Sequence, residues 1–453
     1  MNPTRDGATL VVGAGLAGLV SATVWREKGE PVILVERASH TGGMARSIRQ
    51  DGFIFDIGPH FIIRRTHWLD RLFAPGELIE FVPRIFMVIG DSWIPYPLGL
   101  RSLLHVPLSV QMDFLSTRLF GLKESDECGP PSSFRRNMSR IYGKELFEYF
   151  FRPYLTKKLG GSDLCEGLHS DWWSMSEHER GAVKRCPPAT DSADSSGPLQ
   201  ALRKLSRLRK ELPYVFMQQK LGYPHGGFGE IARRLTDGLV RSGAELRLNT
   251  EVTEIRRDER RILSAEVGGE TVPVRRLIWT GSPVVLARAL GIVPLSLPTL
   301  HVMVFFVTMD RRYPRRGTEV RPLSPDMAFY RGYFPEMISS ELTPGGRSAV
   351  VAEVGTTDLS ALERAGERYG AVADTCVELG LCPRSGITGI SHVCVPHSYP
   401  LYTLDYEAHL QRFYKDLTPL ENLILSGRNA RFQYFNSHQV LMDGERTKED
   451  RLF

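Results

Sequence analysis

The chain has 453 residues, of which 42% are hydrophobic and 24% are charged. This usage is typical of globular proteins, so it excludes the disordered, collagenous and fibrous classes, and the length predicts two or three compact domains. The 57 Lys and Arg exceed the 52 Asp and Glu by a small margin for this length, and a phosphate-bearing small molecule explains that margin as well as a nucleic acid does. We therefore expect a small-molecule substrate and no nucleic-acid partner.

Six cysteines are scattered without a C-x-x-C pair or the histidine spacing of a zinc site, which favours a reducing, cytoplasmic location and no bound metal. The apolar run at residues 9–25 resembles the core of a secretory signal, but glycines interrupt it and no small-residue cleavage site follows. No stretch reaches the roughly 18 to 20 uninterrupted apolar residues that a membrane span needs.

The first elements of the chain predict a parallel sheet. Residues 9–12 (TLVV) predict a buried strand that ends in glycine, residues 16–28 have the apolar spacing of a helix, and residues 31–35 (PVILV) predict a second buried strand. Strand, glycine turn, helix and strand make a βαβ unit whose two strands are parallel. The predicted fold class is therefore α/β, with a Rossmann-like, doubly wound domain of parallel sheet and helices.

After residue 60 the character of the sequence changes. Residues 68–86 and 98–122 mix aromatic residues, prolines and long apolar side chains, and they predict helices that build a substrate-facing wall. Residues 187–198 (PPATDSADSSGP) have almost no apolar side chain, which predicts a mobile loop. Residues 199–212 predict a helix whose basic RKLSRLRK run is a solvated face, because no aromatic side chains interleave the charges.

A second strand-rich block resembles the first. It predicts a helix at residues 230–242, followed by strands at residues 245–249, 252–256 and 276–280. This block therefore adds to the Rossmann-like domain.

The last part of the chain predicts a separate sheet and then a return to the first. Residues 283–352 contain long alternating strands that fit a separate sheet, including a buried run at residues 301–309. Residues 422–427 (NLILSG) predict another buried strand that ends in glycine, and a helix containing residues 438–442 follows.

Residues 13–18 (GAGLAG) lie where a dinucleotide-binding fingerprint needs them, between the first strand and the first helix. The first glycine permits the tight turn, the second lets a pyrophosphate approach the backbone, and the third lets the helix pack on the strand. Glu36 ends the second strand, eighteen residues after Gly18, where an acidic side chain accepts from a ribose 2′-hydroxyl and disfavours the 2′-phosphate of NADP. These residues predict dinucleotide binding.

Five further segments, in chain order, resemble the motifs of one family. They are residues 37–47 (RASHTGGMARS), 55–60 (FDIGPH), 223–228 (YPHGGF), 250–253 (TEVT) and 426–438 (SGRNARFQYFNSH). Together they resemble the large flavoprotein superfamily that contains amine oxidases, protoporphyrinogen oxidases and phytoene desaturases, over nearly the whole chain. The resemblance implies FAD as the cofactor.

The fingerprint and the resemblance together imply a set of FAD contacts. They are Gly13, Gly15, Leu16, Ala17, Gly18, Glu36, Arg37, Gly43, Met44, Ala45, Arg46, Gly58, Pro59, His60, Val252, Gly427, Arg428, Asn436 and Ser437. Arg46 and Arg428 are cations suited to the pyrophosphate, with surface ion pairs as the alternative. A helix beginning after Gly427 would stabilise negative charge on a reduced flavin.

Two branches of the superfamily imply different chemistry. Oxidases, dehydrogenases and desaturases accept a hydride at the flavin, whereas UDP-galactopyranose mutases use reduced flavin as a nucleophile with no net redox change. Residues 58–62 (GPHFI), 151–160 (FRPYLTKKLG) and 329–331 (FYR) resemble mutase segments, but Leu159 replaces the mutase tryptophan and residues 43–46 (GMAR) follow the oxidase pattern. The sequence favours an FAD-dependent oxidoreductase acting on a small organic substrate, with a mutase-like isomerase as the alternative.

A flavin-free binding protein is the second alternative. The same fold resembles the guanine-nucleotide dissociation inhibitors, which carry prenylated partners without FAD, although the intact glycines at 13, 15 and 18 argue against this role. Contact with a membrane surface through residues 68–86 is a further alternative. The sequence leaves the oligomeric state open.

Four side chains are expected around the reacting part of the flavin. His60 is placed beside the flavin ring, where it hydrogen-bonds substrate, tunes the flavin or satisfies the backbone of a turn. Arg331 is either a clamp for a carboxylate or phosphate or an ordinary strand-surface arginine. Tyr399 and Tyr434 line the cavity or pack in an aromatic core. No catalytic acid or base is identified, and flavin chemistry does not require one.

The expected domain layout is discontinuous. An FAD-binding domain takes residues 1–65, 221–285 and 383–453, and an α+β substrate domain takes residues 66–220 and 286–382. The substrate is expected between the two domains, on the flavin face.

Overall fold

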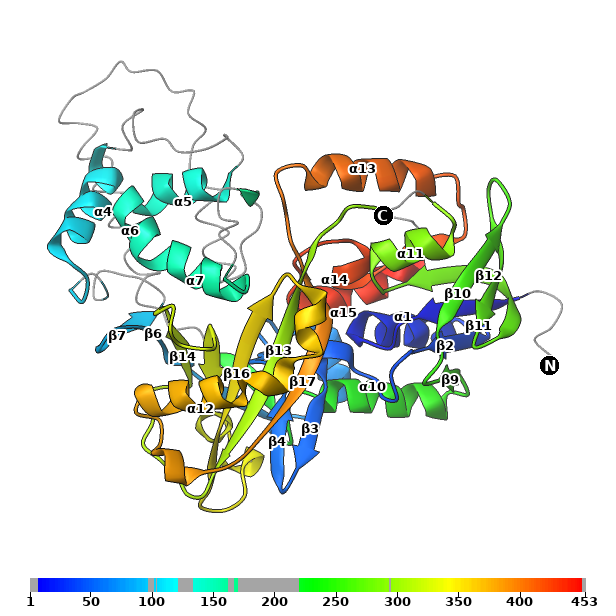
Figure 1. The fold of residues 1–453 in the computed structure, drawn as a ribbon. Helices are drawn as coiled ribbons and strands as arrows, with labels where there is room; N and C mark the ends of the chain where they lie inside the picture. The colour runs from blue at the N-terminus through cyan, green and yellow to red at the C-terminus, as the bar shows by residue number, and fades with distance from the viewer. Residues whose placement is uncertain are drawn as a thin grey trace.

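The computed structural model describes residues 7–96, 102, 104–120, 133–161, 167–169, 220–292 and 295–449. Within these ranges, two seven-stranded sheets lie next to each other and helices cover them (Figure 1). The loop predicted at residues 187–198 and the helix predicted at residues 199–212 lie outside the described residues. The α/β fold predicted from the sequence is confirmed.

The first sheet contains the predicted βαβ unit. Its strands are, in spatial order, β10 (Val252–Arg257), β11 (Ile262–Val267), β12 (Glu270–Trp279), β1 (Ala8–Val12), β2 (Val32–Val35) and β9 (Glu245–Arg247), and β18 (Leu423–Leu425) also pairs with β12. The pairs that join β18, β12, β1, β2 and β9 are parallel, whereas β10, β11 and β12 pair antiparallel. Val11 lies opposite Leu34 in the register of β1 and β2.

Helices cover both faces of this sheet. They are α1 (Leu16–Glu27), α10 (Glu230–Arg241) and α15 (Ser437–Arg446) on one face, and α11 (Pro283–Ala289) and α13 (Tyr406–Leu417) on the other. Val11 and Leu34 pack into the core under the first group, and Leu10 and Leu277 pack into the core under the second. Because alternate side chains enter two different cores, the central strands are continuous apolar runs in the sequence.

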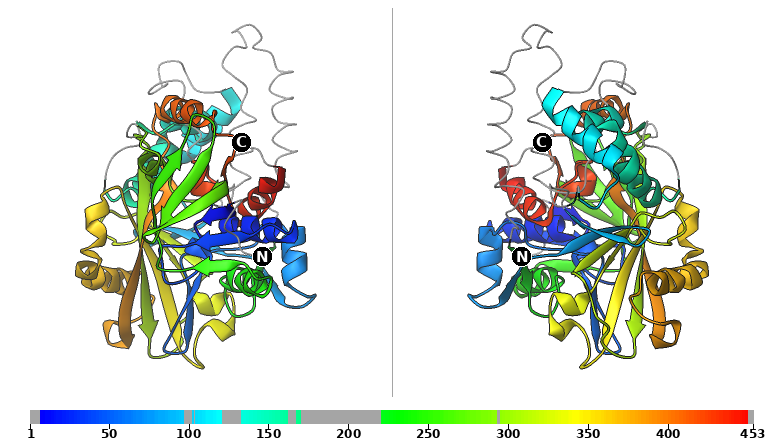
Figure 2. Two further views of the ribbon diagram at one scale, coloured as in Figure 1. Left: turned by 90° about the vertical axis from the view of Figure 1, so that its right-hand side faces the viewer. Right: turned by 90° about the vertical axis from the view of Figure 1, so that its left-hand side faces the viewer.

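The helix α15 lies against α1 in both views of Figure 2, with α15 in red and α1 in blue. Gly444 makes this approach close, since a Cβ added there would lie 2.8 Å from the Ala17 carbonyl oxygen. The Ser21 hydroxyl donates to the Gly444 carbonyl across the same contact at 3.2 Å. The last helix of the chain is therefore fixed to the helix that follows the glycine turn.

The second sheet confirms the separate sheet that the sequence predicts. Its strands are, in spatial order, β17 (Ile387–Pro400), β13 (Thr299–Met309), β16 (Ser348–Thr356), β15 (Arg331–Tyr333), β14 (Glu319–Pro322), β6 (Ile85–Ile89) and β7 (Ser92–Tyr96). Only β14 and β6 pair in parallel among these described strands. Phe305 packs with α12 (Tyr369–Glu378) on one face, whereas Phe306 stacks on Phe55 on the other at a centroid distance of 4.6 Å.

Shorter elements connect and flank the two sheets. The hairpin β3 (Ser47–Gln50) and β4 (Phe53–Asp56) and the pair β5 (Leu78–Phe81) and β8 (Leu221–Pro224) are two-stranded. The remaining α-helices are α2 (His67–Leu72), α4 (Leu108–Phe120), α5 (Phe134–Tyr142), α6 (Lys144–Leu146), α7 (Arg152–Lys158) and α14 (Gly427–Ala430), with a π-helical turn at Phe147–Phe151. Short 3₁₀ turns lie at Gly43–Ala45, Pro335–Met337, Ser340–Leu342, Leu359–Leu362, Ala365–Arg368, Arg384–Gly386 and Thr447–Glu449. The helices α4 to α7 form a group beyond β7 (Figure 1).

Two sequence predictions were wrong. The helices predicted at residues 68–86 do not extend past Leu72, because β5 and the start of β6 follow. These strands pair with β8 and β14, which are distant in the sequence, so no local periodicity indicates them. The strands predicted from residue 283 are wrong at their start, where α11 forms because Ser282 accepts a cap hydrogen bond from the Val284 amide. The helix predicted at residues 98–122 is found over Leu108–Phe120.

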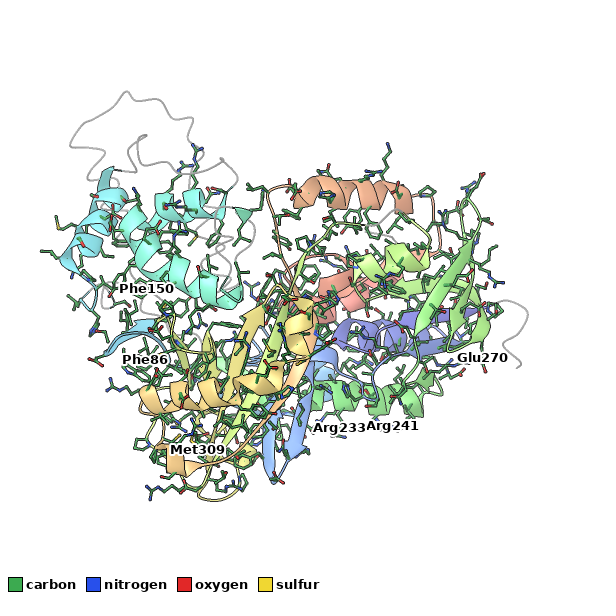
Figure 3. The ribbon with its side chains drawn as sticks, viewed as in Figure 1. Phe86, Phe150, Arg233, Arg241, Glu270 and Met309 are labelled. Atoms are coloured by element: carbon green, nitrogen blue, oxygen red, sulfur yellow. The ribbon has the colours of Figure 1, made fainter. Side chains whose placement is uncertain are left out.

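The two sheets are separated along the molecule, as Figure 3 shows through Glu270 at the start of β12 and Met309 at the end of β13. The predicted domain boundaries stay a prediction. The strand β17 lies in the part of the chain predicted for the FAD-binding domain, and it pairs with β13 in the second sheet.

Within the described ranges, no helix combines the length and the apolar character needed to cross a bilayer.

Candidate cofactor-binding site

A cavity of about 460 Å³ opens at the carboxyl edge of the parallel strands. The ends of three strands contribute Val12 and Gly13 (β1), Val35 and Glu36 (β2), and Trp279 and Thr280 (β12). Ligands of open α/β sheets bind outside this edge. The cavity therefore coincides with the site predicted from residues 13–18.

The three glycines of the fingerprint differ in what surrounds them. Gly13 has a φ of +99° and a Cβ there would lie 2.4 Å from Thr280 Oγ1, so the turn requires glycine. A Cβ at Gly18 would lie 1.8 Å from the Gly13 carbonyl oxygen, which shows how tightly α1 packs on the turn. A Cβ at Gly15 would meet no atom within 4 Å. The second glycine therefore faces open space, where a ligand can approach the backbone.

A second glycine segment supports the first. The Gly42 amide donates to the Ala14 carbonyl at 2.7 Å, and Gly15 and Gly42 form a parallel β-bridge. Gly42 and Gly43 both have positive φ, at +98° and +55°. The residues around Gly43 therefore lie beside the fingerprint and continue the same wall of the cavity.

Glu36 lies on the cavity wall but is bound to the backbone. Its two carboxylate oxygens accept from the Ala14 amide at 2.8 Å and from the Ala38 amide at 2.9 Å. The carboxylate thus fixes the first glycine turn and still has acceptor capacity for a hydroxyl group. The predicted ribose contact stays a prediction.

Two predicted arginines line the cavity with different partners. Arg46 hydrogen-bonds His40, and burial lowers the pKa of both side chains, with Arg46 as a second cause for His40. Arg46 Nε is buried and has no hydrogen-bond partner among the described residues. Arg428 donates from Nε and Nη2 to the Phe435 carbonyl at 3.0 and 2.7 Å. The cavity thus contains an orphaned cationic donor, which fits an anionic ligand such as a pyrophosphate.

The helix expected after Gly427 offers less than the sequence predicts. It is the four-residue α14, and the Gly427 amide already donates to Asp443 Oδ2 at 2.7 Å. The Ser426 hydroxyl donates to the same oxygen at 3.2 Å. The first amide of α14 is therefore occupied by a buried carboxylate of α15.

His60 lies at the other end of the cavity. Its Nδ1 lies 3.1 Å from the Gly58 carbonyl, and its ring contacts Phe228 at a centroid distance of 5.3 Å. Burial, with Arg428 as the next cause, lowers the pKa of His60 to about 4. The imidazole is therefore neutral at pH 7, and it donates Nδ1–H to the turn and directs Nε2 elsewhere as an acceptor.

A buried carboxylate fixes the turn that carries His60. Asp56 accepts from the Ser47 and Tyr223 hydroxyls at 2.5 Å each and from the Phe228 amide at 3.1 Å. Burial raises the pKa of Asp56 to about 6, although these donors oppose the shift. Asp56 therefore joins β4 to the residues that follow β8.

Arg331 lies behind the His60 end of the cavity. Its Nη2 donates to both oxygens of Glu353 at 2.6 Å, and the Tyr330 hydroxyl also donates to Glu353. The Arg331 side chain is 18% exposed and the Glu353 side chain is 2% exposed. Arg331 is thus half of a buried ion pair, and its Nε has no hydrogen-bond partner among the described residues.

Tyr399 and Tyr434 stack on each other beside this group, at a centroid distance of 5.3 Å and an angle of 8°. Arg428 lies over both rings, at 5.1 and 5.4 Å from their centroids, and Lys158 lies 5.3 Å from the Tyr399 centroid. Burial, followed by Arg331, holds the pKa of Lys158 well below its usual range. Lys158 is a buried group at this end that the sequence did not single out.

The structure brings most of the predicted residues together. Those that line the cavity are Gly13, Gly15, Leu16, Ala17, Glu36, Arg37, Gly43, Met44, Ala45, Arg46, His60, Val252, Gly427, Arg428 and Ser437. Those that lie outside its lining are Gly18, Gly58, Pro59, Arg331, Tyr399, Tyr434 and Asn436. Contact of any of them with FAD stays a prediction.

Several lining residues were missed by sequence reasoning, among them His40, Trp279, Ser282 and His397. His397 has a φ of +53°, which is uncommon for a residue other than glycine. Its amide donates to His301 Nδ1 at 2.9 Å, and its own Nδ1 lies 2.7 Å from Thr299 Oγ1. None of the segments singled out in the sequence contains His397, so the sequence gave no signal for this position.

Two family models match the chain. The model of the NAD(P)-binding Rossmann-like domain matches residues 11–74, and the model of flavin containing amine oxidoreductases matches residues 131–303. Among curated proteins, the chain is 24% identical to the 4,4'-diapolycopene oxygenase of Methylomonas sp over 341 residues, which is 70% of this chain and 65% of that protein. The chain covers less than two thirds of the length of the curated relatives that match it first.

Solved structures share the fold over nearly the whole chain. A reduced UDP-galactopyranose mutase superposes with a TM-score of 0.75 at 18% identity, covering 97% of this chain and 94% of that one. A putative protoporphyrinogen oxidase from Exiguobacterium sp. 255-15 superposes with a TM-score of 0.70 at 16% identity, covering 97% of both chains. The superpositions show the fold, and the family matches confirm the predicted resemblance and FAD as the cofactor. The chain is thus similar to the flavin-containing amine oxidoreductases over the residues that the two models match.

Proposed function

We propose that the chain is an FAD-dependent oxidoreductase that takes a hydride from a small organic substrate. The observation that carries the proposal is the open space at Gly15 within a cavity that Glu36 and Arg46 also line. The amine oxidoreductase model supports a redox use of the flavin. The curated relatives include an oxygenase, a phytoene dehydrogenase and desaturases, which supports a carbon–hydrogen donor as the substrate.

The residues of the cavity have separate tasks in this proposal. Gly13 permits the tight turn, Gly15 lets the pyrophosphate approach the backbone, and Gly18 lets α1 pack on the turn. Arg46 supplies a cation and Glu36 accepts from the ribose. FAD held by these residues would supply a two-electron acceptor for the hydride of a substrate carbon, and an external oxidant such as oxygen or a quinone would take up the electrons afterwards. The protein itself therefore binds and orients the cofactor and the substrate, and it excludes water from them.

His60 is the group placed to touch the reacting atoms. It is neutral at pH 7 because its pKa is about 4, so it accepts a hydrogen bond at Nε2 without adding charge beside the flavin. Asp56 fixes the turn on which it lies, and Glu353 Oε1 lies close to Gly58 of that turn. We expect the substrate between His60 and the second sheet, and a cytoplasmic, reducing location for the enzyme.

A reconstitution experiment tests the proposal. The purified chain is loaded with FAD to about one FAD per chain and is made anaerobic. It is then mixed with alcohols, amines or unsaturated hydrocarbons, and loss of the visible flavin absorbance is recorded. We expect one class of substrate to bleach the flavin and oxygen or a quinone to restore it. A chain that binds no FAD would match the flavin-free binding protein, and it would contradict the proposal.

The mutase hypothesis is tested by the same preparation. The mutase structure superposes on 97% of this chain, which shows the fold alone. In the test, chemically reduced holoenzyme is mixed with UDP-galactopyranose without any oxidant. Interconversion of the sugar ring without oxidant consumption would contradict the redox proposal.

A further inference from the structure

Glu353 is the central residue of the buried group behind His60. It lies on β16 with its side chain 2% exposed, and it accepts from Arg331 Nη2 at 2.6 Å through both oxygens. The Tyr330 hydroxyl donates to the same carboxylate. Sequence reasoning singled out Arg331 and did not single out Glu353.

Glu353 also touches the turn that leads to the cavity. A Cβ at Gly58 would lie 2.3 Å from Glu353 Oε1 and 3.7 Å from Arg331 Nη2. The Gly58 carbonyl accepts from His60, which lines the cavity. The ion pair of Arg331 and Glu353 is therefore separated from the cavity by one turn of backbone and one side chain.

Other charged groups around Arg331 do not replace this carboxylate. The nearby Glu319 already accepts from Arg321 Nε at 2.5 Å. Arg428 is a further cation around the tyrosines at this end, and Lys158 is a buried amine whose pKa burial holds well below its usual range. Without Glu353, the group would hold cations with no carboxylate of its own, which is the chemistry of a phosphate or carboxylate site.

We propose that Glu353 is a specificity-determining residue, which cancels the charge of Arg331 and makes the His60 end of the cavity reject substrates with a phosphate or carboxylate group. This inference rests on the proposed function. It specifies a substrate whose part at the His60 end of the cavity carries no charge. A buried carboxylate one turn behind the cavity repels an anion there through the poorly screened interior, and it also occupies the guanidinium that would attract the anion. The Glu353 side chain thus both repels the anion and removes Arg331 as its binding partner.

Binding of UDP and of uridine to the FAD-loaded chain tests the inference, because the two probes differ by a diphosphate. We expect the wild-type chain to bind UDP no more tightly than uridine. Glu353→Gln keeps the size of the side chain and removes its charge, so it should bind UDP at least about tenfold more tightly than wild type and leave uridine unchanged. The double variant Glu353→Gln with Arg331→Gln should lose this gain.

Glu336→Gln is the matched control, because Glu336 is another buried carboxylate of the same half of the molecule. Its Oε1 lies 3.1 Å from Arg315 Nε, and neither residue belongs to the cavity lining. Glu336→Gln should leave the affinities for UDP and for uridine unchanged. Equal UDP affinities in wild type and Glu353→Gln, or a wild-type chain that binds UDP tenfold more tightly than uridine, would overturn the inference. The wild-type comparison decides by itself if Glu353→Gln does not fold. Failure to bind FAD would contradict the proposed function instead.

Discussion

The two ends of the cavity are built in different ways. At the glycine-loop end, the backbone at Gly13 and Gly15 forms part of the wall, within a single strand–turn–helix segment in which Gly18 lets α1 pack on the turn. At the His60 end, side chains from β15, β16, α7 and the turn after β4 come together. Burial lowers the pKa of His60 and of Lys158, and Glu353 raises the pKa of Arg331 against the effect of burial. We therefore expect cofactor binding to depend on local backbone geometry, and we expect substrate choice to depend on buried charges that meet only in the folded chain.

The largest expected effect is at the glycine-loop end. Gly15→Asp adds a carboxylate where no protein atom lies within 4 Å of the new Cβ, so the chain should fold and lose FAD. Repulsion of the pyrophosphate at about 4 Å corresponds to roughly 4 kcal/mol, or about 1000-fold in affinity. Titration with FAD measures this loss. Gly345→Asp is the control, since Gly345 is exposed and equally open, and an unchanged affinity in Gly15→Asp would disprove the placement.

The second effect concerns Asp56, which supports the His60 end. Its folded pKa of about 6 exceeds the ordinary value of 3.8, so its favourable contribution to folding is complete below pH 3.8 and is lost as the pH rises through 6. The loss amounts to about 3 kcal/mol. We expect the free energy of unfolding of wild type, relative to Asp56→Asn, to fall by about 2 kcal/mol between pH 4 and pH 7, because part of the loss has already occurred at pH 4.

Urea unfolding of both chains without FAD, at pH 4, 5, 6 and 7, gives the comparison. His60 has the opposite sign, because its pKa is lowered from 6.5 to about 4 and its contribution is lost as the pH falls. That contribution is present in both chains and cancels in the difference. Parallel stability curves for the two chains would show that Asp56 does not titrate as described.

A smaller effect is expected at Glu36. Glu36→Gln removes the charged acceptor for the Ala14 and Ala38 amides, and a charge-assisted hydrogen bond differs from a neutral one by about 1.4 kcal/mol or tenfold in affinity. FAD titration should therefore show an affinity about tenfold lower. Glu27→Gln serves as the control, because Glu27 pairs with Arg71 on the surface. An equal loss of FAD affinity in Glu36→Gln and Glu27→Gln would show that the net charge of the protein, and not the contacts of Glu36, causes the effect.

The smallest effect on FAD affinity is expected at His60. Because its side chain bonds only the Gly58 carbonyl among the described residues, His60→Gln should retain FAD within about twofold and lower kcat. The pKa of about 4 also predicts no His60 inflection in the wild-type rate between pH 5.5 and pH 8. A large loss of FAD with unchanged kcat would reverse the roles of the two ends.

The contrast between the ends also explains what the sequence could predict. The βαβ unit and its glycines follow from residues within one short segment, so periodicity and spacing identify them. The strands β5 and β6 were predicted as helix, because their partners β8 and β14 are distant in the sequence. Tertiary pairing overrode local preference there.

The same distinction applies to the site residues. Gly15 and Glu36 were predicted because their spacing has a physical reason. Glu353 was missed because it lies within the apolar run of β16 and meets Arg331 only through the pairing of β15 with β16. A helix beginning after Gly427 was expected to stabilise negative charge on a reduced flavin, but the Gly427 amide donates to Asp443 of α15, and no local pattern indicates that contact.

A crystal structure of the FAD-loaded chain tests the central claim most directly. The FAD diphosphate should lie against Gly15 within hydrogen-bond distance of the Leu16 or Ala17 amide, with its adenosine ribose beside Glu36. FAD bound elsewhere, or another molecule bound at Gly15 in a fully loaded preparation, would contradict it.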